Sequence, residues 1–308
     1  MLIARRPSMP NFHIGDGVAK LVEWFQNHWA GFFNACASVM QWLIDKVLFV
    51  LTAPHWLVIV AVAVALAWWA RGVPFAIFTL SGFLLIESMQ LWNDAMQTLA
   101  IVLVASVLAV AVGVPAGIWA AQSRRASAGI RPVLDFMQTL PVFVYLIPAV
   151  FFFGIGVVPA ALSTWIVATP PAVRLTQLGL RQVDPEIVEA GAAFGAKPGQ
   201  LLREIKIPLA VPAIMTGLNQ VVMMALSMVV ISGMVGAGGL GTTVVSGLSR
   251  LDVGMGVEGG LGVVFLAIYL DRLSGAFPKP RKAAPIAIEP KADIAASPEV
   301  GAAPAPTA

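Results

Sequence analysis

The sequence predicts an all-α membrane protein with about seven transmembrane helices. Of its 308 residues, 58% are hydrophobic and 11% are charged, and the mean hydropathy is +0.85. Soluble domains are roughly half apolar and about a quarter charged, so this composition is typical of a chain whose main solvent is lipid. Apolar segments recur along the chain at about the 20-residue length that a helix needs to cross a bilayer. Both observations predict the same fold class.

Seven segments are candidate spans, and each is mostly apolar. The first is short, and its start could instead lie nearer Leu48. The fifth contains Pro170 and Pro171, which remove two backbone donors, so we expect this helix to break or unwind there. The seven segments are 56–70, 73–92, 97–121, 141–158, 160–178, 209–234 and 255–273.

The two flanks of this region differ from it. Residues 1–55 are expected to form a tail and an amphipathic helix over 18–50, in which apolar and polar side chains alternate with helical spacing. We expect this helix to lie on the bilayer surface. Residues 276–308 are rich in alanine and proline and are predicted to be disordered.

Basic residues predict the orientation, because lysine and arginine in short loops favour the cytoplasmic side. Three basic sites are separated by even numbers of crossings, which places them and the C-terminus in the cytoplasm. The N-terminus is then outside, and Arg5, Arg6 and Lys20 there depart from the rule. The basic sites are Arg124, Arg125 and Arg131; Arg181, Lys197, Arg203 and Lys206; and Arg272, Lys279, Arg281 and Lys282.

The composition also argues against several classes of site. The net charge of +3 is small and the basic residues form no stripe, so no nucleic-acid partner is expected. The single cysteine, Cys36, allows no intrachain disulfide. His13, His28 and His55 lie far apart, and we expect no metal site. No triad or carboxylate pair indicates covalent chemistry, so no catalytic residue is predicted.

The polar segment 181–208, between the fifth and sixth spans, is expected to fold outside the membrane. Asp184 suits the N-cap of a helix, Pro185 its first position, and Gly195 a left-handed stop. A second short helix is expected over 198–206, ending before the proline that follows. The small residues of this segment would let another protein approach closely, and Phe194 is expected to anchor in a pocket of that protein.

The spacing within this segment is specific. Glu189, Ala190 and Gly191 are followed by Gly195 and then by Ile-Lys-Ile-Pro at 205–208. The pattern resembles the EAA loop of binding-protein-dependent ABC importers, which reads Glu-Ala-Ala, three residues, Gly, nine residues, Ile-x-Leu-Pro. Gly191 and Ile207 are the two departures from it. The resemblance implies a coupling helix that docks in a cleft of an ATPase, through Glu189, Ala190, Gly191, Phe194, Gly195, Ile205 and Pro208. An ordinary capped connector is the alternative.

Five stretches carry a wider resemblance: MQTLPVFVYL at 137–146, FGIG at 153–156, PPAVRLT at 170–176, ALSMVV at 225–230 and RLDVG at 250–254. They are similar to permeases of quaternary-amine importers of the glycine betaine/proline betaine type. The resemblance implies a five-helix type I ABC importer core over 97–275. Two additional transmembrane helices over 56–96 precede this core, and the protein is expected in a bacterial inner membrane.

What the resemblance implies for function is ATP-driven import of a quaternary ammonium osmolyte by alternating access. The solute would be glycine betaine, proline betaine or choline, as in osmoprotection. The implied partners are an ATPase subunit, an external binding protein and a second copy of the chain. The chain contains no G-x-x-x-x-G-K-[ST] loop, so a separate ATPase would use the ATP and no cofactor is expected here. An amino-acid-type importer permease and a secondary transporter are the alternatives.

Candidate pathway residues lie in the sixth span. Thr216, Asn219, Met223 and Ser227 are three or four positions apart and are expected to share one helix face. This face either lines the pathway or joins neighbouring helices through hydrogen bonds. Tyr145 and Trp165 are candidate pathway aromatics, because aromatic rings attract quaternary ammonium groups.

The run at 236–241 fits the pattern G-x-G-x-x-G. A dinucleotide site would require a preceding strand and an acidic residue about 20 positions further on. The run instead follows a membrane span, and we expect a tight external re-entrant turn near the gate.

Overall fold

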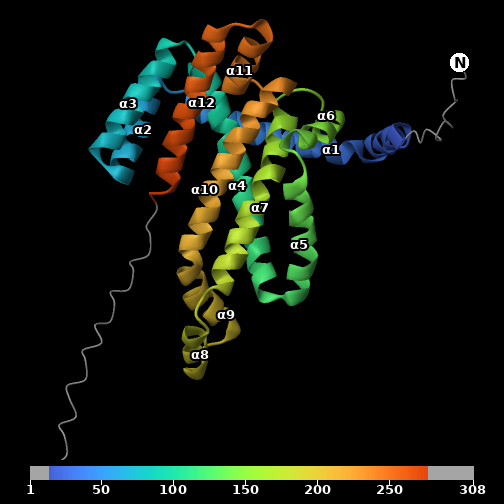
Figure 1. Ribbon diagram of the computed structural model, residues 1–308, viewed down its shortest axis with the longest axis vertical. Helices are drawn as coiled ribbons and strands as arrows, with labels where there is room; N and C mark the ends of the chain where they lie inside the picture. The colour runs from blue at the N-terminus through green and yellow to red at the C-terminus, as the bar shows by residue number, and fades with distance from the viewer. Residues whose placement is uncertain (1–13, 277–308) are drawn as a thin grey trace, which may run out of the picture.

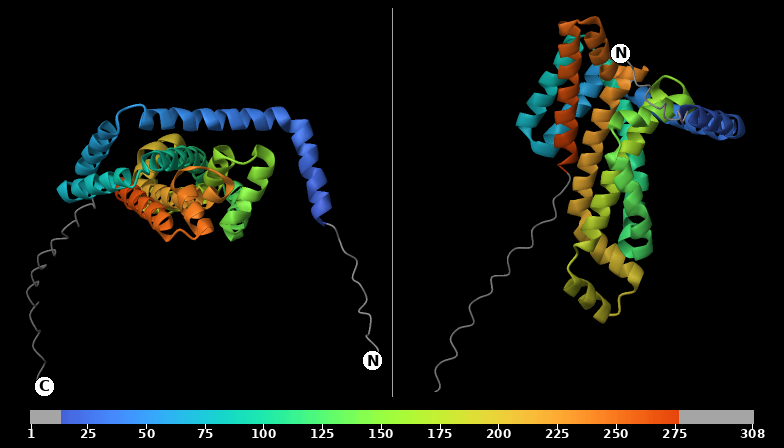
Figure 2. Two further views of the ribbon diagram at one scale, coloured as in Figure 1. Left: turned by 90° about the horizontal axis from the view of Figure 1, so that it is seen from above. Right: turned by 45° about the vertical axis from the view of Figure 1, so that its right-hand side comes forward.

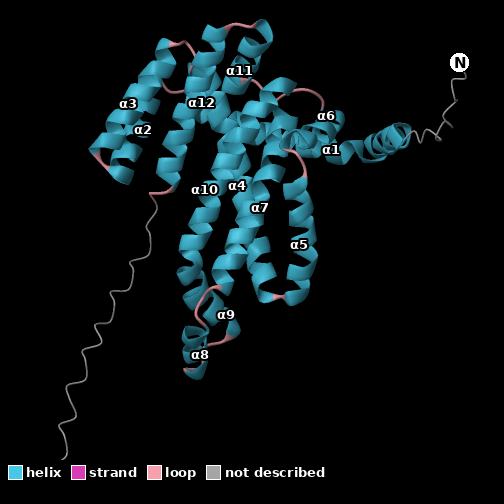
Figure 3. Cartoon of the chain, viewed as in Figure 1, coloured by secondary structure: helices cyan, strands magenta, loops and turns pink. Residues whose placement is uncertain are grey.

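The computed structural model of the chain describes residues 14–276, and every regular element within them is a helix (Figure 3). The prediction of an all-α fold is therefore confirmed. The first 13 residues and the predicted C-terminal tail from 277 onward, with Lys279, Arg281 and Lys282, lie outside the described residues.

The elements follow one another with short connections, and their arrangement is shown in Figure 1. In chain order they are α1 (Ile14–Thr52), α2 (Trp56–Arg71), α3 (Val73–Ser88), α4 (Trp92–Gln122), α5 (Arg124–Thr139), the 3₁₀ turn η1 (Val142–Tyr145), α6 (Leu146–Phe153), α7 (Val157–Arg181), α8 (Pro185–Ala193), α9 (Pro198–Gln200), the π-helical turn η2 (Leu201–Lys206), α10 (Ile207–Ser232), the 3₁₀ turn η3 (Gly233–Val235), α11 (Gly239–Arg250) and α12 (Val253–Ser274).

Four helical stretches of the described chain are long and apolar enough to cross a membrane. The bent pair α5 and η1–α6 would make a fifth, whereas α2 and α3 are apolar but have 16 residues each. The number of spans predicted from the sequence, about seven, therefore stays a prediction. The four stretches are Ala19–Thr52, Trp92–Gln122, Pro198–Val235 and Val253–Ser274.

The predicted span 141–158 is wrong, because this segment does not form one helix. It contains η1 and the eight-residue α6, and the chain bends by 107° between α5 and this pair. The cause lies at both ends of the segment. Pro141 separates α5 from η1, and Gly154 and Gly156 take φ angles of +77° and +139°, which end α6.

The expected break at Pro170 and Pro171 is also wrong, since α7 is continuous from Val157 to Arg181. Both prolines are buried, and α7 packs against α4 on one side and α10 on the other. The hydroxyl of Thr169 donates to the carbonyl of Trp165 at 2.7 Å. Packing from neighbouring helices and a nearby hydroxyl are the means by which membrane helices tolerate proline.

The second short helix does not end before Pro208 but continues into α10. Pro198–Val235 forms one helical stretch of 38 residues, which we call the rod helix. Within its first turns, the amide of Ile207 donates to the carbonyl of Leu202, five residues back. This wider π-helical turn accommodates the proline ring without a break.

Small residues set the close packing of α4, α7 and α10. A Cβ placed on Gly117 of α4 would lie 2.6 Å from the carbonyl oxygen of Val173 in α7. A Cβ on Gly179 of α7 would lie 2.6 Å from the Cβ of Ala213 in α10. The three backbones therefore approach as closely as glycine allows, which is typical of helix packing in membranes.

The amphipathic segment 18–50 forms most of α1, which is kinked at Trp29. Viewed along the long axis, α1 runs beside the bundle and bends round its corner at the kink (Figure 2). Before the kink, Nε2 of Gln26 donates to the carbonyl of Phe151 in α6. Phe33 stacks on Phe152 of α6 with 4.6 Å between ring centroids, while Trp24 and Phe32 are exposed. Because α1 also has the length and composition of a span, its surface location stays a prediction.

The close packing at Gly117 gives the first prediction. Gly117→Ala should lower the free energy of unfolding by about 1–3 kcal/mol, because the added Cβ meets a backbone oxygen that cannot move aside. The matched control is Gly129→Ala in α5, where a Cβ meets nothing within 4 Å and better helix propensity should be neutral or stabilising. The measurement is the thermal unfolding midpoint in detergent. Equal midpoints for the two variants would contradict the packing.

Candidate functional site

The segment 181–208 lies at one end of the long axis, beyond the helical bundle (Figure 1). The carboxylate of Asp184 accepts the amide of Glu186 at 2.9 Å, which caps the N-terminus of α8. Pro185 follows at the start of the helix, and Gly195 takes a φ of +85° after its end. The predicted start and stop of this helix are confirmed.

The outer surface of α8 is free of contacts with the rest of the described chain. Glu189 and Ala190 are exposed, and the ring of Phe194 is 93% exposed. An aromatic side chain this exposed gains nothing from packing within the chain. These three residues are therefore available to a partner.

The inner surface of α8 rests on the start of the rod helix. A Cβ on Gly191 would lie 2.6 Å from Cδ1 of Ile205 and 2.9 Å from Cδ2 of Leu201. Gly191 and Ile205 thus hold the two helices together, whereas Pro208 is exposed at the start of α10. The residues of the loop pattern divide into an outward set and a packing set.

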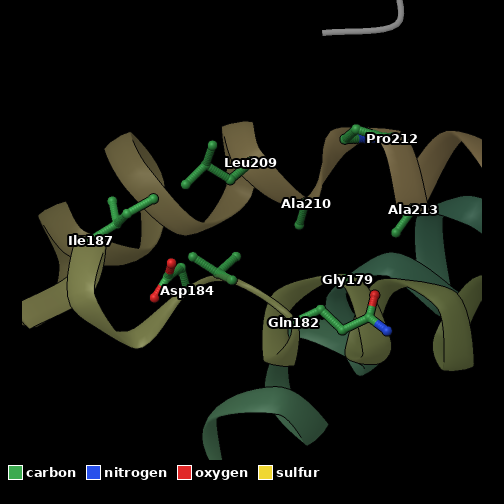
Figure 4. A pocket seen from close by; sticks show the side chains of 9 residues that line it. Gly179, Gln182, Asp184, Ile187, Leu209, Ala210, Pro212 and Ala213 are labelled. Carbon is green, nitrogen blue, oxygen red and sulfur yellow. The ribbon is translucent and has the colours of Figure 1, made fainter. Parts of the chain in front are cut away.

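A cavity of about 340 Å³ lies behind α8 (Figure 4). Its walls come from the end of α7, the link to α8 and the start of α10, and Ile187 of α8 and Leu209 of α10 contribute to one side. The cavity lies between the α7–α8 link and the start of α10, while α8 is in contact with the rod helix. The residues that line the cavity are Gly179, Gln182, Val183, Asp184, Ile187, Leu209, Ala210, Pro212 and Ala213.

Basic side chains gather between α5 and α7. Arg131, Arg174 and Arg181 line one cavity of about 390 Å³, together with Asp135. Arg174 forms an ion pair with Asp135, and Arg181 donates to the carbonyl of Ala120 at 3.0 Å. This charge is consistent with the predicted cytoplasmic side, because basic residues concentrate there.

The four candidate pathway residues of α10 do not act as one set. Thr216, Met223 and Ser227 are exposed, and the two hydroxyls bond to carbonyls of their own helix. Asn219 instead donates to the carboxylate of Asp271 in α12 at 2.8 Å and accepts the hydroxyl of Ser274 at 2.5 Å. For Asn219 the hydrogen bonds favour the helix-joining alternative. Pathway lining stays a prediction for the other three.

The two candidate aromatics lie in different surroundings. Tyr145 is in η1, and its hydroxyl donates to the carbonyl of Met137. Trp165 of α7 lines an apolar cavity of about 330 Å³ together with Phe32 and Cys36 of α1. The two rings therefore do not form a shared cation site within one chain.

The glycine run at 236–241 forms a tight turn over 236–238 and the first residues of α11. Sequence reasoning missed the hydrogen bonds that hold it. Nε2 of Gln97 donates to a carbonyl of the turn at 3.0 Å, and Oγ1 of Thr98 accepts a backbone amide at 2.9 Å. The hydroxyl of Thr243 in α11 donates to Asp94 at 2.6 Å. The available signal was the polar spacing at 94, 97 and 98 in an apolar span, which places all three on one helix face.

A family model described as "Binding-protein-dependent transport system inner membrane component" matches residues 113–277. The chain is 42% identical over 266 residues to a glycine betaine transport system permease protein of Bacillus subtilis, covering 86% of this chain and 94% of that one. It is 44% identical over 280 residues to a glycine betaine/carnitine transport permease protein of Listeria monocytogenes, covering 90% and 99%.

The fold is also similar to that of a solved structure, an inward-facing form of the MetNI methionine ABC transporter. The TM-score is 0.54 at 22% sequence identity, and the match covers 61% of this chain and 96% of that one. At this identity the likeness concerns the fold.

The contact between Asn219 and Asp271 gives the second prediction. Asn219→Leu should lower the free energy of unfolding by about 1–3 kcal/mol, because it leaves a carboxylate and a hydroxyl without their partner. Thr216→Val, at an exposed position of the same helix, should change it little. The measurement is the thermal midpoint of each variant in detergent. If the two variants unfold at the same temperature, the interhelical role of Asn219 is wrong.

Proposed function

The chain belongs to the family of binding-protein-dependent transport system inner membrane components, and on that premise we propose that it is the permease of an ATP-driven importer for a quaternary ammonium osmolyte. Its family and its apolar helices make it a multi-pass inner-membrane transport subunit. Two relatives that the chain covers almost completely are transport permeases, which supports the same class.

The single observation that carries the mechanism is the exposed outer surface of α8. Phe194 and Glu189 project from a capped helix outside the bundle, and α8 packs on a helix that runs to the opposite end of the fold. In the proposed mechanism, a separate ATPase subunit binds this surface. ATP-driven closure of two such subunits then moves α8 together with the rod helix, and the pathway alternates between its two openings.

The proposed assembly contains two copies of the chain, two ATPase subunits and an external binding protein. The basic cavity near Arg131 and Arg181 supports a cytoplasmic location for the α8 end. The C-terminus is then cytoplasmic and the glycine turn is external. A second copy supplies the other wall of the pathway, which would face Thr216, Met223 and Ser227.

The relatives are the basis for the proposed solute. Both are named for glycine betaine, and we extend that solute class to this chain, with proline betaine and choline as further candidates. In the proposed assembly, the tight site for the solute belongs to the binding protein on which the family depends. An amino-acid importer would share the fold but would not be expected to show this identity to glycine betaine permeases. A secondary transporter binds no ATPase, so it would not need the exposed surface of α8.

The third prediction tests the coupling surface together with the solute. The chain, its ATPase and its binding protein are reconstituted in vesicles, and uptake of labelled glycine betaine and choline is measured with and without ATP. Phe194→Ala should lower ATP-driven uptake about tenfold or more. An aromatic side chain that becomes buried in the partner on docking contributes a large share of the binding energy. Gly199→Ala is the matched control, since a Cβ at that exposed position meets nothing within 4 Å.

Two results would contradict the proposal in different ways. If Phe194→Ala supports the same uptake as Gly199→Ala, α8 is not the coupling surface. If ATP is hydrolysed by an intact assembly but neither solute enters, the importer class stands and the quaternary-amine solute is wrong.

A further inference from the structure

The turn between α11 and α12 carries a leucine in a conformation that favours glycine. Leu251 has a φ of +56° and a ψ of +28°, in the left-handed region. Bulky side chains rarely adopt this region, because their Cβ meets the backbone. In the described part of the chain, Gln90 is the other non-glycine residue with positive φ.

The turn is firmly built. The amide of Asp252 donates to the carbonyl of Gly247 at 2.8 Å, and the amide of Leu251 donates to the carbonyl of Leu248 at 3.2 Å. This pair of bonds is the Schellman arrangement, in which glycine usually occupies the position of Leu251. Asp252 also caps α12 by accepting the amide of Met255 at 3.1 Å. Leu251 is therefore held in place by the hydrogen bonds around it.

Folding of the chain alone does not explain this leucine. Its side chain is 85% exposed, so packing within the chain offsets neither the backbone strain nor the contact of an apolar group with water. Leu248 and Val253 beside it are 74% and 77% exposed. The same helix-end position after α8 is occupied by Gly195, whose φ is +85°. Strain that the fold does not require is a mark of a functional position.

The surroundings of this apolar tip indicate a protein partner. Arg250, Asp252 and Glu258 are exposed around it, so charges of both signs rim an apolar centre. Protein interfaces have this anatomy, an apolar core with a polar rim. A buried membrane segment would avoid such charges, and an anionic lipid surface would select basic residues alone. The tip and α8 lie at opposite ends of the molecule (Figure 1).

We propose that the α11–α12 tip, with Leu251 as its fixed apolar anchor, is a docking surface for the external solute-binding protein. The inference rests on the proposed function, because the family depends on a binding protein and the α8 end is assigned to the ATPase. The partner surface is expected to have an apolar pocket for Leu251 and charged groups that complement Arg250 and Asp252. A rigid anchor loses little freedom on docking, which favours affinity.

The fourth prediction uses substitutions that suit the backbone of the turn. Leu251→Gly and Leu251→Asn fit positive φ, so both variants should fold at least as well as the original chain. In the full assembly in lipid nanodiscs, the binding-protein concentration for half-maximal stimulation of ATP hydrolysis should rise about tenfold in both. The matched control is Gln90→Gly in the α3–α4 turn, because Gln90 is the other non-glycine residue with positive φ in the described chain. This variant should leave the half-maximal binding-protein concentration unchanged.

Direct binding of the binding protein to immobilised nanodiscs separates this inference from the proposed function, because no solute has to be transported. Weaker binding by both Leu251 variants supports the docking surface even if glycine betaine is not taken up. Binding equal to that of Gln90→Gly overturns it even if uptake is normal. Two further results overturn it in favour of another occupant. If the Leu251 variants lower the mass of the assembled complex, the tip contacts the second copy of the chain. If they weaken binding only in nanodiscs with certain lipid headgroups, the tip contacts lipid.

Discussion

The rest of the structure depends on the continuity of the rod helix, Pro198–Val235. Its first turns pack under α8, and its last turn leads into the glycine turn that Gln97 and Thr98 of α4 hold by hydrogen bonds. A helix propagates a displacement along its axis because backbone hydrogen bonds join each turn to the one before it. In the proposed mechanism, a push on α8 is carried along this helical stretch toward the far end of the bundle.

The close packing of α4, α7 and α10 determines what this displacement can move. Gly117 and Gly179 allow backbone contact between neighbouring helices, so α7 packs closely against both α4 and α10. The buried prolines 170 and 171 stay helical because of this packing. By contrast, a cavity lies between the α7–α8 link, at Gln182, and the start of α10. In the proposed mechanism, motion at α8 passes first into the rod helix, with which α8 is in contact, and then into α7 through its contact with α10.

Much of this account could be predicted from the sequence, where local chemistry decides the outcome. The composition predicted an all-helical membrane protein, and Asp184, Pro185 and Gly195 predicted the limits of α8. Two errors arose where packing overrides local preference: α7 passes two prolines, and the rod helix passes Pro208. Spacing alone also does not reveal contacts between residues that are far apart in the chain. Examples are the hydrogen bond from Asn219 to α12 and the polar contacts of the glycine turn. The strain at Leu251 is visible only in the backbone angles.

The most direct test of the central claim is the ratio of solute imported to ATP hydrolysed when the rod helix is interrupted. Two glycines inserted after Lys206 would break the helix between α8 and the bundle while leaving the exposed surface of α8 intact. The account predicts that the assembled complex still hydrolyses ATP while the solute imported per ATP falls close to zero. An unchanged ratio in a stably inserted chain would show that the rod helix does not transmit the movement.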